Sequence, residues 1–582
     1  MRTNNTGNKK VLKSFVKDLR FLYTWWAILI VITLFSNLII ALNPLIVRGI
    51  IDVAISQKDV GLLFKLIILF VIIFLVQVGT DGFQSYMQTV IGQKATARFR
   101  LKLIRKLFRL PLSFFHKNDK GDLLNRMEVD INSVDLLSSR LLLVIISQII
   151  SMLYSLIMMA YLHLPLFVYT IIIVPGIYFF QKRTGKKYKS KSMEGRENIS
   201  KLFHIDNDIL NGIDFIKSNG NYPRLIHWYS EALRKWYRNN ISLSLINLQN
   251  TFFLGSGALI IMLLTFGLGG YYVIGGTMTV GGLVAYKTYI ERMYNSMFTL
   301  SATWLQYQKS LTGMERIYWV LDQPSPVIHN PGRTKREISG NFVFENVSFH
   351  YDNGTQILNQ ANFEIIPYVR NVIVGANGVG KSTLFHLISR QYPVTGGQII
   401  MDEERLEHYS DYQLRQYTGV IFQEQFFFSN TLFENFKYVK ENVSEEQVWG
   451  VLDKVGMKAW ASGLPQGLDS LLGTGGIQLS GGQKQKLSLA RLILKKPSVL
   501  LLDEPSSSFD TSSKEMLYKC LEEEFTGCTI ILISHDLESI KEDDHVIFVY
   551  DASCVEEGTH SELIRNSFNY RKLWSIEIQG TV

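Results

Sequence analysis

Long runs of apolar residues that hold few charges fill the first half of the chain. Six runs approach or exceed the ~20 residues that a helix needs to cross a bilayer core, near residues 22–47, 62–90, 138–161, 164–181, 246–273 and 279–303. Over the whole chain, 47% of residues are hydrophobic and 19% are charged, against about 25% charged in soluble proteins. We therefore predict a bundle of six transmembrane helices. A chain of 582 residues is also too long for one compact core, so a second domain is expected.

The charges between the apolar runs predict how the bundle is oriented. The links after the second and fourth runs are basic, with Lys94, Arg98, Arg100, Lys102, Arg105, Lys106 and Arg109 in one and Lys182, Arg183, Lys186, Lys187, Lys189 and Lys191 in the other. The links after the third and fifth runs contain no Lys or Arg. Basic links remain in the cytoplasm, so we expect a multi-pass protein of the cell membrane with both termini inside. The net charge of +9 then reflects membrane orientation and not nucleic-acid binding.

Other features divide the chain into domains. The first apolar run lacks a small-residue cleavage site and is interpreted as a membrane helix, not a removed signal peptide. Helical patterning in the basic links predicts that the membrane helices continue into the cytosol. Prolines at Asp322–Pro326 mark a linker, and short β-type runs begin near Asn341. The prediction is a membrane domain over 1–320, a linker over 321–340 and an α/β domain over 341–582. The three cysteines, Cys520, Cys528 and Cys554, lack metal-site spacing and are expected to be reduced thiols.

A glycine-rich segment in the α/β domain has the spacing of a phosphate-binding loop. Gly375–Ser382 matches GxxxxGK[ST], after a strand-like run at Asn371–Val374 and before a helix-like run. Backbone N–H groups of such a loop, with the following helix N-terminus, bind phosphates. Lys381 is expected to reach the β- and γ-phosphates and the Ser382 hydroxyl to ligate Mg²⁺. A glycine-rich turn with an incidental lysine is the alternative, which the strand–loop–helix context disfavours.

Two acids follow an apolar run later in the same domain. Val499–Leu502 reads as a buried strand that ends at Asp503 and Glu504. In parallel sheets the carboxyl ends of such strands bind ligands. Asp503 would hold Mg²⁺, through water, and Glu504 would polarise an attacking water. The two acids could instead cap a helix, but the phosphate-binding loop favours catalysis.

Between these segments lies Leu479-Ser480-Gly481-Gly482-Gln483, which resembles the signature sequence of ABC transporters. Alone, it could be a serine-capped helix start. Other positions match the family in order: Tyr351 resembles the aromatic residue that stacks on adenine, and Gln423 the Q-loop glutamine. Ser507–Asp510 resembles the D-loop, and His535 the switch histidine that contacts the γ-phosphate. Taken singly, Tyr351 and His535 would more often be packing residues.

The resemblance implies ATP and Mg²⁺ as cofactors and a full set of site residues. The expected catalytic residues are Glu504, His535, Gln423 and Lys381. The expected ATP contacts are Tyr351, Gly375, Asn377, Gly378, Gly380, Lys381, Ser382, Thr383, Ser480, Gly481, Gly482 and Gln483. The expected Mg²⁺ ligands are Ser382, Gln423 and Asp503.

The whole chain is similar to an exporter-type half-transporter, in which a six-helix membrane domain precedes an ATPase domain. Pro111–Asp122 resembles the family's first cytoplasmic loop, whose tip forms a coupling helix that docks on an ATPase domain. A second coupling helix is expected near Leu202–Ile213, docking on the partner's ATPase domain. One departure concerns coupling: Ser470–Gly476 lacks the charged residues that exporters usually carry ahead of the signature.

In ABC ATPases the phosphate-binding loop of one domain and the signature of another enclose each ATP, so a dimer is implied. Because this chain holds both elements, a homodimer suffices, exporting by alternating access. A soluble ABC ATPase is excluded by the six spans, and importers usually keep the two domains on separate chains. An ATP-gated channel or regulator and a lipid flippase remain alternatives. The expected substrate is amphipathic, a peptide-like antimicrobial or a drug.

The sixth span suggests where that substrate binds. It contains Tyr286, Lys287, Thr288, Tyr289, Glu291, Arg292, Tyr294, Asn295 and Ser296 among apolar residues. Charges at such depth are expected to face a cavity or a partner. The second span adds a polar stripe of Gln77, Asp81, Gln84 and Gln88. These patterns predict a polar cavity, with a structural Lys287–Glu291 pair and an Asp81 bond to a neighbouring span as the alternative.

Overall fold

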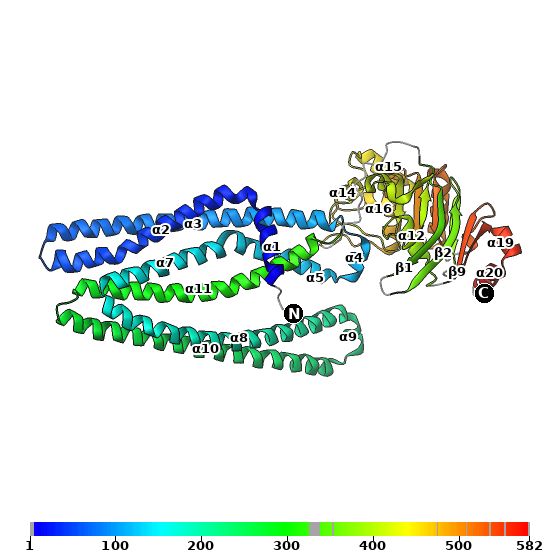
Figure 1. Cartoon of the computed structure of the whole chain (residues 1–582). Helices are drawn as coiled ribbons and strands as arrows, with labels where there is room; N and C mark the ends of the chain where they lie inside the picture. Colours follow the sequence, from blue (N-terminus) through cyan, green and yellow to red (C-terminus); the bar gives the residue numbers. More distant parts are fainter. Residues whose placement is uncertain are drawn as a thin grey trace. The chain divides into compact units, whose positions relative to one another are not determined.

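The structure, a computed structural model, describes residues 5–324, 338–351, 354–376, 378–473, 475–507, 509–534, 537–551 and 554–579. The chain divides into two compact units (Figure 1). The first is helical and contains residues 1–106 and 121–322, and the second contains residues 107–120 and 323–582. Most of the predicted linker, 321–340, lies outside the described residues.

The helical unit holds each predicted span in its own long helix. Its elements are α1 (Asn5–Asp18), α2 (Tyr23–Gly49), α3 (Val60–Leu107, whose last residue belongs to the second unit), α5 (Lys120–Asn125), α6 (Asn132–Asp135), α7 (Leu141–Leu162), α8 (Leu164–Asn211), α9 (Ile213–Asn219), α10 (Tyr222–Ile274) and α11 (Val280–Leu321). Short π-helical turns join α5, α6 and α7. The predicted spans fall in α2, α3, α7, α8, α10 and α11.

Length and composition alone identify four helical stretches among the described residues as able to cross a membrane. They are Arg20–Ile55, Val60–Leu107, Lys120–Leu162 and Tyr222–Ile274. The fourth and sixth predicted spans lie in α8 and α11, which are helices of 48 and 42 residues. The count of six spans therefore stays a prediction, while the prediction that helices extend far beyond a bilayer core of ~20 residues is confirmed.

Within this unit α7 packs along α11 and α8 packs along α10 (Figure 1). Tyr286 and Tyr289 of α11 are fully buried in a cluster with residues of α7, α8 and α10. The short helix α9 connects the C-terminal end of α8 to the N-terminal end of α10 (Figure 1). A second coupling helix near Leu202–Ile213 stays a prediction. In the structure α8 continues through most of this range to Asn211, and the separate short helix α9 begins at Ile213.

The second unit contains two sheets. The smaller is antiparallel with strand order β2–β1–β4–β5, made of β1 (Phe342–His350), β2 (Gln356–Ile365), β4 (Gly396–Met401) and β5 (Glu404–Arg405). The larger has the order β10–β9–β3–β8–β7–β6, made of β3 (Arg370–Val374), β6 (Thr418–Ile421), β7 (Val499–Asp503), β8 (Thr529–Ile533), β9 (His545–Asp551) and β10 (Cys554–Thr559). All its neighbouring pairs are parallel except β9–β10. Strands β7 and β8 are buried at every residue, which explains their unbroken apolar sequence.

Helices surround these sheets, and the buried side chains of this unit form three hydrophobic clusters. They are α4 (Leu112–Lys117), α12 (Lys381–Ile388), α13 (Asp411–Tyr417), α14 (Leu432–Lys437), α15 (Glu445–Lys454), α16 (Lys458–Ser462), α17 (Gly481–Lys495), α18 (Thr511–Glu524), α19 (His560–Asn566) and α20 (Phe568–Gln579). One cluster holds the small sheet and α12, and a second holds α14, α15, α17 and α18. In the third, α19 and α20 pack against β3 and β9. A membrane helical bundle with an α/β ATPase-type domain is therefore the observed fold. Cys520 and Cys528 are buried free thiols, and burial raises the pKa of both. The side chain of Cys554 lies outside the described part.

Candidate nucleotide site

The parallel strands of the large sheet bring four predicted site segments to one edge. The phosphate-binding loop follows β3, Gln423 follows β6, Asp503 ends β7, and Ser534 follows β8. Because the carboxyl ends of parallel strands meet at one edge, segments far apart in sequence face the same space. His535 and Asn377, both predicted to contact phosphate, lie outside the described residues.

The phosphate-binding loop has the predicted strand–loop–helix form. Gly380 has φ of +111°, and a Cβ at this position would lie 2.3 Å from Ile357 Cγ2, so only glycine fits. Lys381 is buried, and its Nζ donates hydrogen bonds to the carbonyl oxygens of Gly375 at 2.7 Å and Ala376 at 3.0 Å. Helix α12 begins at Lys381. The loop's lysine is thus aligned along the loop at the N-terminus of a helix, as phosphate binding requires.

The two predicted acids lie at the end of β7 with different exposures. Asp503 is 7% exposed; its burial and the neighbouring Glu504 carboxylate raise the pKa of Asp503 to about 6, against the opposing effect of the Lys381 ammonium. Glu504 has φ of +48°, a left-handed conformation that is costly for a residue with a side chain and is concentrated at functional sites. Its carboxylate accepts a hydrogen bond from Gln423 Nε2 at 3.1 Å. The structure therefore brings the predicted Q-loop glutamine to the predicted water-polarising acid.

The predicted Mg²⁺ ligands fit a hard cation by their chemistry. A serine hydroxyl, a carboxylate and a side-chain amide oxygen are oxygen ligands of the kind that Mg²⁺ prefers. Ser382 lies exposed at the start of α12, and α12 packs beside β7, which ends at Asp503. Asp503 and Glu504 are adjacent carboxylates, and a divalent cation bound beside them would reduce the repulsion between them.

Tyr351 lies beside the phosphate-binding loop. Its hydroxyl is 2.8 Å from Thr383 Oγ1, in a hydrogen bond that either group can donate. Its ring meets the rings of Phe349 and Tyr392 edge to face, with centroids 5.1 and 5.6 Å apart. The ring is partly buried, so both roles considered for it, packing and adenine stacking, are compatible with its position.

The signature sequence begins α17. Ser480 and Gln483 form a capping box, in which the Ser480 side chain accepts from Gln483 N and the Gln483 side chain accepts from Ser480 N. The capped helix start that was considered as an alternative is therefore present. It does not oppose nucleotide binding, because Ser480 and Gly481 are exposed at the helix N-terminus.

Two residues that the sequence did not single out connect α17 to neighbouring segments. Gln485 Nε2 donates to Ser507 Oγ at 3.2 Å, in the segment that resembles the D-loop. Arg491 donates to Phe426 O at 3.1 Å and to Asn435 Oδ1 at 2.7 Å, and burial lowers the pKa of Arg491 to about 10. Both are polar residues on the buried face of a helix, which is the sequence signal that would have identified them.

The loop that departs from the exporter pattern is held by backbone contacts. Leu471 pairs with Thr431, and Leu472 pairs with Ile477, in isolated β-bridges. Gly473 has φ of +80°, and a Cβ there would lie 2.6 Å from Ser429 Oγ. Thr474 is outside the described residues. A tight glycine-dependent turn therefore takes the place of a charged segment.

The segment predicted to be the first cytoplasmic loop lies largely in the same compact unit as the α/β domain, which includes residues 107–120. It forms α4, and Leu112 packs against the cluster that contains the small sheet and α12. His116 Nδ1 lies 2.5 Å from the Tyr392 hydroxyl. Since Tyr392 also contacts Tyr351, one tyrosine touches both the loop helix and the aromatic residue beside the phosphate-binding loop. Tyr392 was not predicted.

Most charged groups proposed for a membrane cavity are paired within the helical unit. Lys287 Nζ is 2.8 Å from Glu291 Oε1, and Asp81 accepts from Ser36 Oγ at 3.0 Å. These contacts match the structural alternative for both. Arg292 differs, since its Nη1 donates to a backbone carbonyl, that of Ile40, at 2.7 Å.

Comparison with known proteins agrees with this geometry. Residues 26–297 match the family model for the ABC transporter transmembrane region, and residues 358–507 match the family model described as ABC transporter. The chain is 26% identical to the uncharacterized ABC transporter ATP-binding protein YfiC of Bacillus subtilis, over 98% of this chain and 94% of that protein. It is also 26% identical to the ATP-dependent lipid A-core flippase of Syntrophus aciditrophicus, over 98% and 96%.

A third relative, the human ABC-type oligopeptide transporter ABCB9, is 26% identical over 88% of this chain and 67% of that protein. The solved structure of a bacterial Atm1-family ABC exporter with ATP bound superposes with a TM-score of 0.81 at 24% identity, covering 96% of this chain and 98% of that one. This likeness shows the shared fold. With both family models in one chain, the protein belongs to the ABC transporter family as an exporter-type half-transporter that hydrolyses ATP.

Proposed function

We propose that the protein exports an amphipathic substrate from the cytoplasmic side outward, driven by ATP, as a homodimer in the cell membrane. The observation that carries this is the hydrogen bond between Gln423 and Glu504 beside the phosphate-binding loop. It joins a segment expected to contact the membrane domain to the acid expected to polarise water. Hydrolysis and movement of the helical unit would thereby be linked.

In this proposal the site residues act as follows. Lys381 and the backbone N–H groups of Gly378 and Gly380 bind the phosphates, and Tyr351 stacks on adenine. Glu504 orients the attacking water, held in place by Gln423, and His535 contacts the γ-phosphate. When bound at Ser382, Asp503 and Gln423, Mg²⁺ neutralises charge that develops on the phosphate oxygens.

The dimer is supported by where the two halves of an ABC nucleotide site lie. The phosphate-loop helix α12 and the signature helix α17 pack in different hydrophobic clusters. Ser480 and Gly481 are exposed, as expected of residues that complete the site of a second copy. The exposed apolar side chains Leu210, Phe215 and Ile226 around α9 are suited to the partner's ATPase domain.

The decisive experiment is transport by the full-length protein in inside-out vesicles. ATP-dependent accumulation of a fluorescent amphipathic peptide, absent in Glu504→Gln, supports peptide export. Translocation of a fluorescent phospholipid without peptide accumulation would favour a lipid flippase, the activity named for the Syntrophus relative. ATP hydrolysis with neither movement would contradict export and favour a regulator.

A further inference from the structure

A proline in the first membrane helix explains why Arg292 points at a backbone carbonyl. Pro44 lies inside α2. Because proline has no N–H, the carbonyl of Ile40, four residues earlier, loses its helical donor. Arg292 Nη1 of α11 donates to this carbonyl at 2.7 Å. The arginine thus has one structural task.

Two tyrosine hydroxyls donate to the next carbonyl of α2. The carbonyl of Ala41 accepts from the Tyr289 hydroxyl at 2.9 Å and from the Tyr154 hydroxyl at 3.2 Å. Neutral hydroxyls therefore serve as donors to an α2 carbonyl close to Pro44. The hydrogen bond to Ile40 O likewise needs an N–H donor and not a positive charge.

That charge has no acidic partner in the described part of the helical unit. The ion pair on the same stretch of α11 joins Lys287 to Glu291 and does not include Arg292. A guanidinium has five N–H donors, and one of them is used at Ile40. Arg292 lies near the centre of the predicted sixth span, where an uncompensated cation is costly and marks a functional site.

Arg292 also borders a cavity. The cavity has a volume of about 120 Å³ and lies among α2, α7 and α11, with Asn37, Ser151, Tyr154 and Arg292 as its polar lining. Ser151 accepts a hydrogen bond from Ser296 at 3.2 Å, so its own hydroxyl proton is available to donate. The cavity therefore combines a cation, a hydroxyl donor and space for a small headgroup.

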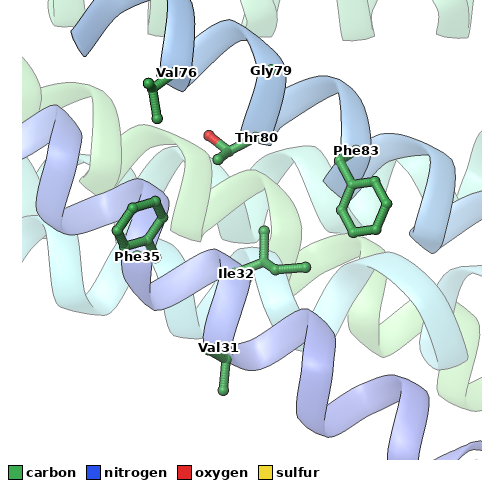
Figure 2. Close-up of a pocket in the computed structure, with 7 residues that line it drawn as sticks. All are labelled: Val31, Ile32, Phe35, Val76, Gly79, Thr80 and Phe83. Carbon is green, nitrogen blue, oxygen red and sulfur yellow. The ribbon is translucent and has the colours of Figure 1, made fainter.

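A second cavity, which also borders α2, has a different lining. It has a volume of about 430 Å³ between α2 and α3 and is lined by Val31, Ile32, Phe35, Val76, Gly79, Thr80 and Phe83 (Figure 2). Its side chains are apolar except for the Thr80 hydroxyl. An anionic group would be recognised at Arg292 and not here.

We propose that Arg292 binds the anionic group of the substrate, a carboxylate or phosphate on an amphipathic molecule. This inference rests on the proposed export function and specifies its substrate class. The amphipath could be a bilayer lipid or a soluble acylated molecule, since both present the same headgroup chemistry.

The test uses the full-length protein in phosphatidylcholine nanodiscs and measures how ligands stimulate ATP hydrolysis. One arm compares an acylated peptide that ends in a free carboxylate with the same peptide ending in an amide. The other arm adds phosphatidylglycerol to the nanodiscs. A charge-assisted hydrogen bond to the carboxylate predicts that the acid is effective at about 10- to 100-fold lower concentration than the amide.

Arg292→Gln is expected to abolish this preference, because glutamine can still donate to Ile40 O but carries no charge. Pro44→Ala restores a helical N–H for Ile40, so the double variant Pro44→Ala, Arg292→Gln separates charge from folding. Arg140→Gln removes an exposed cation of the same unit and is the matched control, expected to retain the preference.

The anion site is supported if stimulation of ATP hydrolysis is lost in the double variant. Stimulation by the acylated acid points to a soluble ligand, and stimulation by phosphatidylglycerol points to a bilayer lipid. Equal stimulation by acid and amide in the wild type, or an unchanged preference in the double variant, overturns it. Transport of a neutral amphipathic dye distinguishes the two proposals. If the dye is exported without any anion preference, the anion site is wrong and export stands.

Discussion

Gln423 Nε2 donates a hydrogen bond to a Glu504 carboxylate oxygen at 3.1 Å, although 81 residues separate them. The bond orients an acid whose backbone is already in a left-handed conformation. It therefore fixes the position of the group expected to hold the attacking water.

Glu504→Gln is expected to bind ATP but to hydrolyse it at least ~100-fold more slowly, because a positioned general base contributes that much. Gln423→Ala should also slow hydrolysis, since it removes both the partner that orients the acid and a proposed Mg²⁺ ligand. Steady-state phosphate release and nucleotide binding measure both. In the double variant the two effects should add only in part, because one of the two roles of Gln423 acts through Glu504. Normal turnover of Glu504→Gln would refute the assignment.

Lys381→Ala is expected to weaken ATP binding and stop transport. It removes the buried ammonium that contacts the Gly375 and Ala376 carbonyls and that is expected to reach the phosphates. Titration with a fluorescent ATP analogue measures the affinity. Lys440→Ala, at an exposed position after α14, is the matched lysine control. Wild-type affinity in Lys381→Ala would show that the loop binds phosphate without its lysine.

Tyr392→Phe is expected to reduce substrate stimulation of ATP hydrolysis several-fold while changing ATP affinity little. The variant deletes the hydroxyl that lies 2.5 Å from His116 Nδ1 and keeps the ring that packs on Tyr351. His116→Phe should have the same effect. Tyr412→Phe, a 78% exposed tyrosine of the same domain, is the control. Unchanged stimulation in both variants would show that the contact plays no part in coupling.

Co-expression tests the homodimer. Lys381→Ala and Ser480→Arg are each expected to be inactive alone, because each damages both sites of a homodimer. In a mixed dimer, one site combines an intact phosphate-binding loop with an intact signature. ATP hydrolysis should therefore reappear when the two variants are purified together through different tags. A mixed sample that stays inactive, or an active monomer by detergent-corrected mass, would contradict this arrangement.

Asp544→Asn is expected to destabilise the ATPase domain by about 3–5 kcal/mol, the usual cost of breaking a buried ion pair. Arg370 and Asp544 are 11% and 5% exposed, and Arg370 Nε donates to Asp544 Oδ1 at 2.8 Å. Lys541→Gln breaks an exposed pair with Glu522 and should cost at most about 1 kcal/mol. Thermal unfolding of the full-length protein compares the two. Equal melting temperatures would show that the buried pair is dispensable.

Local patterns predicted the parts of the site that local chemistry determines. The phosphate-binding loop, the acids after β7 and the capped start of α17 each depend on residues adjacent in sequence. The common edge of the sheet followed from the rule for parallel strands.

Contacts between distant segments were not predictable in the same way. His116 and Tyr392 are 276 residues apart, and neither has a local pattern that points to the other. The start of α9 at Ile213 was not predictable, because helical propensity continues through the end of α8 without a breaking residue before Gly212. Pro44 did carry a usable signal, since a proline inside a membrane helix implies that a neighbour must supply a donor.

The placement of residues 107–120 with the ATPase domain has a practical consequence for work on that domain alone. A fragment that starts near Asn341 would lack the helix that covers Tyr392, leaving an aromatic surface open to water. Such a fragment would tend to self-associate through this surface. The side chain of Tyr392 would also become more exposed to solvent. A synthetic peptide spanning residues 107–120, added to the fragment, would serve as the smallest reagent that occupies the same surface.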